Sequence, residues 1–167
     1  MSALRRLLER DTPPVQVWVC EGGLLEAFAG EASLRPDLRL LTLDGSQART
    51  SPRLFEALAQ GLSFPPHFGH NWDALDECLH DLEWIPQSTL VLLVGHSEQL
   101  LVDEEEGLAL LLGILASAAK ELEEPVMGNV CLRRAPLALR VLLQVNPAVA
   151  SLLRGRLRAA GRELPHW

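Results

Sequence analysis

Histidine and carboxylate side chains are concentrated in one short segment, residues 67–81. His67, His70 and Asp73 follow one another at steps of three, and these residue types suit a metal site or an acid–base set. His67 precedes the helix expected here, however, and the spacing fixes no third strong ligand. A small metal-dependent hydrolase using His67, His70 and Asp73 is therefore kept as an alternative, and an interface or structural role for these residues is preferred.

The same segment carries a row of carboxylates at helical spacing. Asp73, Glu77 and Asp81 are four residues apart, which places them on one face of a helix. Each like-charge pair costs roughly 0.2–0.5 kcal/mol of helix stability. The helix dipole favours a carboxylate only in the first turn, so it does not help Asp81. A face that opposes the stability of its own helix indicates a partner, although a merely solvated acidic face stays open as an explanation.

The distribution of charge along the chain points to the same region. The net charge is −7, but residues 54–119 hold eleven Asp or Glu and no Lys or Arg. The flanks hold all fifteen basic residues against eleven acidic ones, a net +4. An acidic field repels nucleic acid and speeds the encounter with a basic partner. We therefore expect a basic protein partner and no direct contact with nucleic acid; an acidic interaction module for a partner other than a nuclease remains a further alternative.

Composition limits the classes of protein to which the chain can belong. With 167 residues, 48% of them hydrophobic and 22% charged, the chain fits one globular domain. The most apolar run, residues 108–119, falls short of the ~20 residues that a membrane-spanning helix needs. The first fourteen residues have no apolar signal region. Cys20, Cys78 and Cys131 form no CxxC pair and suggest reduced thiols. We expect a cytoplasmic protein without disulfide, zinc site, cofactor or membrane contact.

Along the chain, apolar patterns typical of strands alternate with patterns typical of helices. The strands expected are 15–19, 38–43, 89–94 and one later run, either 130–132 or 139–145, of which the second is preferred because it is longer and more apolar. The helices expected are 22–32, 51–61, 71–82, one from about 103, and 146–161. This alternation predicts an α/β fold, a small, mostly parallel sheet of three to four strands flanked by helices in a single domain.

Local signals place the helix ends and the loop between two of these helices. Ser51 is expected as an N-cap with Pro52 behind it, and Gly61 as the stop of that helix. The acids at 103–106 suit the start of the next long helix. Asn71 is expected to cap the helix that follows the loop. Gly69 is expected to supply an unusual backbone conformation in the loop, and the aromatic rings at 68 and 72 to pack the loop onto the domain.

The helix after Asn71 has two faces. Leu75, Cys78, Leu79 and Leu82 share the inward stripe. The remaining polar residues are expected to point outward: Asp73, Asp76, Glu77, His80 and Asp81.

Residues 64–82 read FPPHFGHNWDALDECLHDL. This run resembles the signature of the barstar family of ribonuclease inhibitors, with about ten fixed positions at the same spacing. The strands expected at 38–43 and 89–94 flank it as the resemblance requires. The resemblance covers residues 38–145 and is dense from 62 to 84. Residues 1–37 are then an N-terminal extension, an extra strand and helix packed on the domain, and 146–167 a C-terminal helix.

The resemblance implies a stoichiometric inhibitor and not an enzyme. In that family a loop and helix enter the cleft of a basic ribonuclease, where carboxylates meet the Arg and Lys that would bind RNA phosphate. Asp73 and Glu77 fall on two of the family's contact carboxylates. The partner-binding residues implied here are His67, Gly69, His70, Asp73, Asp76, Glu77 and Asp81. By this resemblance the chain is a bacterial immunity protein that is monomeric when free.

The chain departs from the family pattern at three positions. His67 stands where the family has an aromatic contact in the loop, Asp76 where it has a tryptophan, and Leu82 where it has another aromatic residue. Fewer aromatic anchors and more negative charge indicate a different and more basic cognate nuclease.

Overall fold

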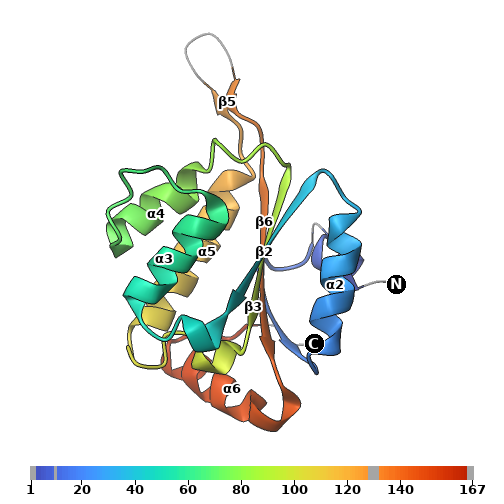
Figure 1. Cartoon of the computed structure of the whole chain (residues 1–167), viewed down its shortest axis with the longest axis vertical. Coiled ribbons are helices and arrows are strands. Elements are labelled where there is room, and N and C mark those ends of the chain that lie inside the picture. The colour runs from blue at the N-terminus through green and yellow to red at the C-terminus, as the bar shows by residue number, and fades with distance from the viewer. Residues whose placement is uncertain (1–2, 10, 128–131, 165–167) are drawn as a thin grey trace.

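Four parallel strands form the centre of the molecule. The structure is a computed structural model that describes residues 3–9, 11–127 and 132–164. The strands β1 (Val15–Val19), β2 (Leu38–Asp44), β3 (Thr89–Gly95) and β6 (Ala138–Val145) lie in the order β1-β6-β3-β2 (Figure 1). All neighbouring strands run parallel. The α/β fold with a parallel sheet is therefore confirmed, as is the preference for residues 139–145 as the last strand.

The alternative run, residues 130–132, lies partly outside the described residues. Its last residue begins β5 (Leu132–Arg134), which pairs antiparallel with β4 (Val126–Met127) in a separate two-stranded ribbon. Buried Arg134 holds the base of this ribbon, because its guanidinium donates to the carbonyl oxygens of Leu122 at 2.8 Å and Glu124 at 3.2 Å.

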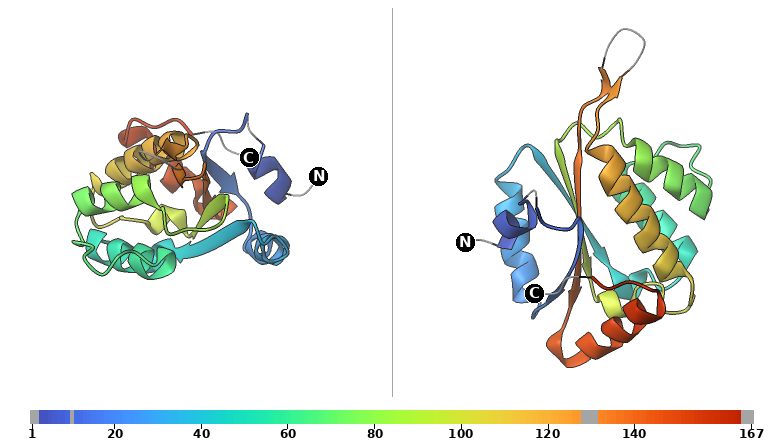
Figure 2. Two further views of the ribbon diagram at one scale, coloured as in Figure 1. Left: turned by 90° about the horizontal axis from the view of Figure 1, so that it is seen from above. Right: turned by 180° about the vertical axis from the view of Figure 1, so that it is seen from behind.

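Helices cover both faces of the sheet, which explains why β3 is buried along its whole length. On one face lie α3 (Ser51–Leu62), α4 (Trp72–Asp81) and α5 (Gly107–Leu122). On the other lie α1 (Ala3–Leu7) and α2 (Gly23–Ser33), packed against a smaller core (Figure 2). The sheet and both helical layers thus form one unit that holds α4 in place.

The chain after β6 forms a short 3₁₀ turn, η3 (Pro147–Val149), and then α6 (Ala150–Ala159), which crosses one end of the molecule (Figure 1). Two further 3₁₀ turns, η1 (Gly45–Gln47) and η2 (Ser97–Gln99), follow β2 and β3. Leu153 and Leu157 of α6 are buried, as their spacing predicts, whereas Leu152 is exposed. The expected helix from 146 is thus confirmed, and it begins with a 3₁₀ turn.

The start of α3 differs from the sequence prediction. Thr50 is the N-cap and Ser51 the first helical residue. The Ser51 amide donates to Glu104 Oε1 at 2.7 Å, and its hydroxyl donates to the other carboxylate oxygen of Glu104. Glu104 therefore caps a helix more than fifty residues away, because the chain at 101–103 bonds back to the backbone of Ala48 and Arg49.

Two further helix ends differ from the sequence prediction. The acids at 103–106 do not begin a helix: α5 starts at Gly107, and Asp103 forms a two-pronged ion pair with Arg49 at 2.8 Å. At its other end α3 runs one residue past Gly61, to Leu62, and stops at Ser63 in the left-handed conformation.

Replacing Glu104 by alanine is expected to lower the free energy of unfolding by about 1–3 kcal/mol, because the Ser51 amide and hydroxyl, both partly buried, lose their acceptor. Glu105→Ala, the neighbouring exposed carboxylate, is the matched control and is expected to stay within about 0.5 kcal/mol of the parent. Denaturant unfolding of both variants measures the difference. Equal stability of the two variants would contradict the capping role.

Candidate functional site

An aromatic cluster fixes the loop between α3 and α4. The rings of Phe64 and Phe68 lie 4.9 Å apart, and Phe55 of α3 lies 5.1 Å from Trp72, the first residue of α4. The indole N–H of Trp84 donates to the carbonyl of Leu62 at 2.8 Å. The prediction that Phe68 and Trp72 pack the loop onto the domain is confirmed. Such interlocked rings hold the loop in a fixed conformation.

The junction of loop and helix is built by Asn71. Its side chain accepts from the amide of Ala74 at 2.8 Å, so the predicted cap is confirmed. The unusual backbone falls on His70, with φ 50°, and not on Gly69 as expected. His70 is held there because its Nδ1–H donates to the carbonyl of Phe68 at 3.0 Å. At Gly69 a Cβ would lie 3.0 Å from Asn71 Nδ2, so the close approach of the capping side chain, and not the backbone angle, favours glycine.

The inward side of α4 anchors the helix to the core. Leu75 and Leu79 are fully buried, and Leu82, which ends the helix in the left-handed conformation, is buried as well. Cys78 is half-buried. On the outward side, the structure leaves all the residues predicted to bind a partner exposed: His67, Gly69, His70, Asp73, Asp76, Glu77 and Asp81. Loop and helix therefore form one continuous surface, which we call the loop–α4 face.

The loop–α4 face carries four exposed carboxylates, and two of them, Asp73 and Glu77, have no partner within the described residues. No hydrogen bond or ion pair within the described chain engages the carboxylate of Asp73 or Glu77. The half-buried thiol of Cys78 reports this field: burial raises its pKa, and the negative charges of Asp81 and Glu77 raise it further. Such a surface is suited to receive cations from another molecule.

His80 does not point outward as the helical pattern predicts. Its side chain is 20% exposed and lies between α4 and α5. Nδ1 lies 2.8 Å from the carbonyl oxygen and 3.1 Å from Oδ1 of Asp76, and Nε2 lies 3.0 Å from the hydroxyl of Ser117. Helical spacing alone does not predict this bridge, because Ser117 is distant along the chain. The one signal of the bridge in the sequence is a serine within the apolar part of α5.

The geometry gives no support to the metal-site alternative. In the part of the chain that the structure describes, which includes His67, His70 and Asp73, no three His, Cys, Asp or Glu side chains gather in a way that could hold a metal ion. The three residues are thus exposed neighbours on the loop–α4 face and not a ligand cluster.

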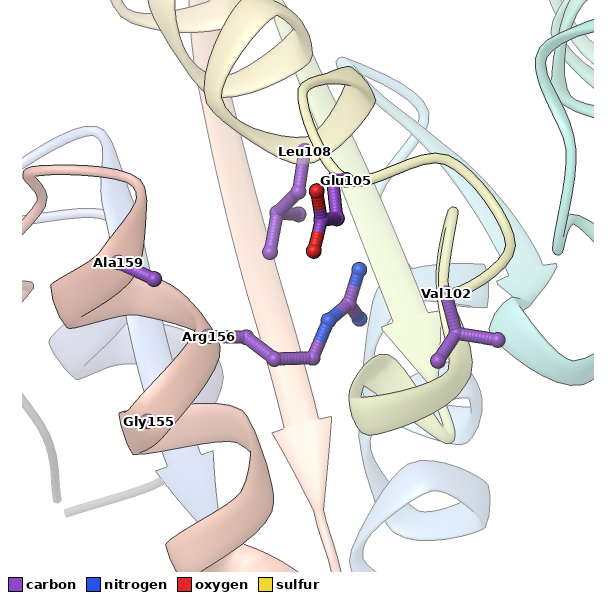
Figure 3. A pocket seen from close by; sticks show the side chains of 6 residues that line it. All are labelled: Val102, Glu105, Leu108, Gly155, Arg156 and Ala159. Carbon is purple, nitrogen blue, oxygen red and sulfur yellow. The ribbon is translucent and has the colours of Figure 1, made fainter.

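A separate hollow of about 230 Å³ lies between α6 and the start of α5 (Figure 3). Helix α6 crosses the end of the molecule away from α4 (Figure 1). Val102 and Leu108 supply its apolar wall, and Arg156 and Glu105 point toward one another inside it (Figure 3). Arg156 also donates to the backbone oxygen of Glu98 at 3.0 Å. The hydrogen bond from Arg156 ties α6 to the domain, and the hollow adds no residue to the loop–α4 face.

Fold and site together describe a parallel α/β domain that presents an acidic loop and helix on a packed base. The chain is a member of the barstar family: the model of that family, described as "Barstar (barnase inhibitor)", matches residues 38–143, well over half of the chain. The match leaves out α1, β1 and α2 at the beginning and α6 at the end. The family is one of ribonuclease inhibitors and not of enzymes.

The other comparisons concern the fold alone or find nothing. A chain in the "Structure of Drosophila ORC bound to AT-rich DNA and Cdc6" superposes with a TM-score of 0.51 at 16% sequence identity. The superposition covers 98% of this chain and 49% of that one, so this chain spans about half its length. A comparison with curated proteins gives no match. Within the residues described, none of the helices has the length and apolar character needed to cross a membrane.

Proposed function

We propose that this protein is a stoichiometric inhibitor of a basic ribonuclease and blocks the active site of that enzyme with the loop–α4 face. The single observation that carries the proposal is the pair Asp73 and Glu77, two exposed carboxylates one helical turn apart with no partner in the described chain. Arg and Lys side chains that bind RNA phosphate bind carboxylates by the same charge-assisted hydrogen bonds. The inhibitor thereby occupies the place of the substrate.

The stiffness of the loop–α4 face supports this mode of action. Phe68 and Trp72 are locked by ring contacts, Asn71 caps α4, and Leu75 and Leu79 root the helix in the core. Carboxylates on a rigid support lose little conformational entropy on binding, so more of the interaction energy contributes to affinity.

The test is an inhibition panel. Barnase and other basic microbial ribonucleases are titrated with the purified protein, and RNA cleavage is followed. A stoichiometric inhibitor brings cleavage to zero at one equivalent of the protein, without a cofactor. If every enzyme of the panel remains fully active, the proposal is wrong and the acidic face serves a basic protein of another kind.

We further propose that the inhibitor acts in the bacterial cytoplasm as an immunity protein and is monomeric when free.

The rate of association is expected to fall steeply with ionic strength, while the rate of dissociation changes little, because steering by the loop–α4 face acts over a distance that salt shortens. The Debye length shrinks from ~10 Å at 0.1 M to ~3 Å at 1 M salt, which removes steering but not the contact pairs. Stopped-flow mixing of inhibitor and ribonuclease over this range measures both rates. An association rate that is independent of salt would mean that the acidic surface is only solvated.

A further inference from the structure

His80 contacts one carboxylate of the loop–α4 face, that of Asp76. Its Nδ1 lies within 3.1 Å of both the carbonyl oxygen and the carboxylate of Asp76, so Nδ1 carries a hydrogen and donates it. Its Nε2 meets the hydroxyl of Ser117 on α5 at 3.0 Å. The ring is thus clamped between two helices, and it holds the Asp76 carboxylate in one orientation.

Within residues 54–119, histidine is the only type of side chain that can carry a positive charge. Residues 54–119 contain no Lys or Arg and four histidines: His67, His70, His80 and His96. An imidazole ordinarily changes its charge between about pH 5 and 8. Of the four, His80 alone contacts a carboxylate of α4, while His96 pairs with Asp44 at the end of β2.

Two carboxylates face the His80 ring from the two helices packed around it. Asp76 on α4 lies 3.1 Å from Nδ1, and Glu121 on α5 lies 3.9 Å from Nε2. In the neutral ring, Nε2 accepts from the Ser117 hydroxyl. In the protonated ring, Nε2 donates and the positive charge offsets that of Asp76. The Asp76 carboxylate then attracts a cation of the partner less strongly.

We propose that His80 is a positioning residue for Asp76 and that its protonation weakens the hold of the loop–α4 face on a cationic partner. This inference rests on the proposed function. It has a reciprocal consequence: because the partner binds the neutral form better, binding to the protonated form displaces a proton from His80.

The experiment compares the parent with His80→Gln, which keeps a donor and an acceptor for Asp76 and Ser117 but takes up no proton. Dissociation constants are measured at pH 7.5 and 5.5 against a ribonuclease that the panel shows to be inhibited, barnase first. The parent is expected to lose about fivefold more affinity than His80→Gln, the size expected for one unit charge near a cation at a hydrated surface. All other groups of the inhibitor and of the enzyme are the same in both pairs, so their effects cancel in the comparison.

Two further variants separate position from charge. His80→Ala removes the clamp and is expected to weaken binding several-fold at pH 7.5, while His80→Gln stays within about twofold of the parent. Ser117→Ala is the matched control, because it removes the contact with α5 but keeps a titratable ring. It should retain the pH dependence of the parent. Calorimetry at pH 6 in two buffers of different ionisation enthalpy should detect more proton release for the parent than for His80→Gln.

The outcomes distinguish this inference from the proposed function. Parallel pH profiles for the parent and His80→Gln overturn the role of His80, whatever the absolute affinity. If Asp73→Ala and Glu77→Ala weaken binding while those profiles are parallel, the loop–α4 face stands and only this inference fails. If no ribonuclease is bound, or if the two carboxylate variants bind like the parent, the proposed face is wrong and the inference fails with it.

Discussion

Asp73→Ala and Glu77→Ala are each expected to weaken ribonuclease binding by about 2 kcal/mol or more, roughly a thirtyfold rise in Kd, without destabilising the fold. Each substitution leaves an Arg or Lys of the enzyme desolvated and unpaired in the complex. In the free inhibitor both carboxylates are exposed and unpartnered, so their removal costs no internal contact. It relieves like-charge repulsion along α4, which is expected to raise stability by a few tenths of a kcal/mol.

The control for this pair is Glu105→Ala, which removes the same charge from the hollow beside α6 and leaves the loop–α4 face intact. It should alter the association rate slightly through the net charge and leave the dissociation rate unchanged. Stopped-flow mixing measures the rates for the three variants, titration calorimetry their Kd and thermal melts their stability. Binding by Asp73→Ala and Glu77→Ala at the parent's affinity would refute the assignment of the face even though the family is established.

The elements of the fold could be predicted because their patterns are local. The strands at 15–19, 38–43 and 89–94 agree with β1, β2 and β3 to within one residue, since short apolar runs between turn residues have few other solutions. The choice of 139–145 over 130–132 rested on length and apolar content, which is what a strand buried on both faces needs.

The errors at the starts of α3 and α5 come from contacts between segments that are distant in sequence. Ser51 looks like a cap because serine caps helices, and Glu104 looks like a helix start because acids favour the first turn. In the structure each satisfies the other, and the helix ends shift accordingly. A local pattern contains no information about a partner that lies fifty residues away.

In the candidate site too, local spacing predicts some positions correctly, and a contact with a distant segment changes another. Periodicity alone places Asp73 and Glu77 outward and Leu75 and Leu79 inward, as the structure has them. His80 lies on the polar side by the same periodicity, yet α5 comes close enough to half-bury it beside Ser117. The exposure of a residue on a helix depends on which helix packs beside it, and sequence spacing does not contain that information.

The role of the segments outside the family match stays a prediction. We predicted residues 1–37 as an extension and 146–167 as a C-terminal helix beside a domain of 38–145. β1 pairs in register with β6 over five residues, from Val15 with Val141 to Val19 with Val145. Trp18 of β1 packs edge-on against Phe28 of α2 in the smaller core. The N-terminal segment thus covers the β6 edge and one face of the sheet, which would otherwise be exposed to solvent.

Leu79→Ala is expected to have the converse effect of the carboxylate variants, lowering the free energy of unfolding by about 2–5 kcal/mol. Leu79 is 1% exposed and lies on the inward side of α4, so its truncation leaves a cavity beneath the acidic face. Because the outward carboxylates are untouched, the fraction that remains folded should bind the ribonuclease with nearly the parent's affinity. Leu110→Ala is the matched control, since this leucine of α5 is 45% exposed and its truncation should change stability by less than about 0.5 kcal/mol. Denaturant unfolding of both variants decides the point: if they prove equally stable, α4 is not rooted in the core through Leu79, and the rigid support on which the inhibitory mechanism depends is absent.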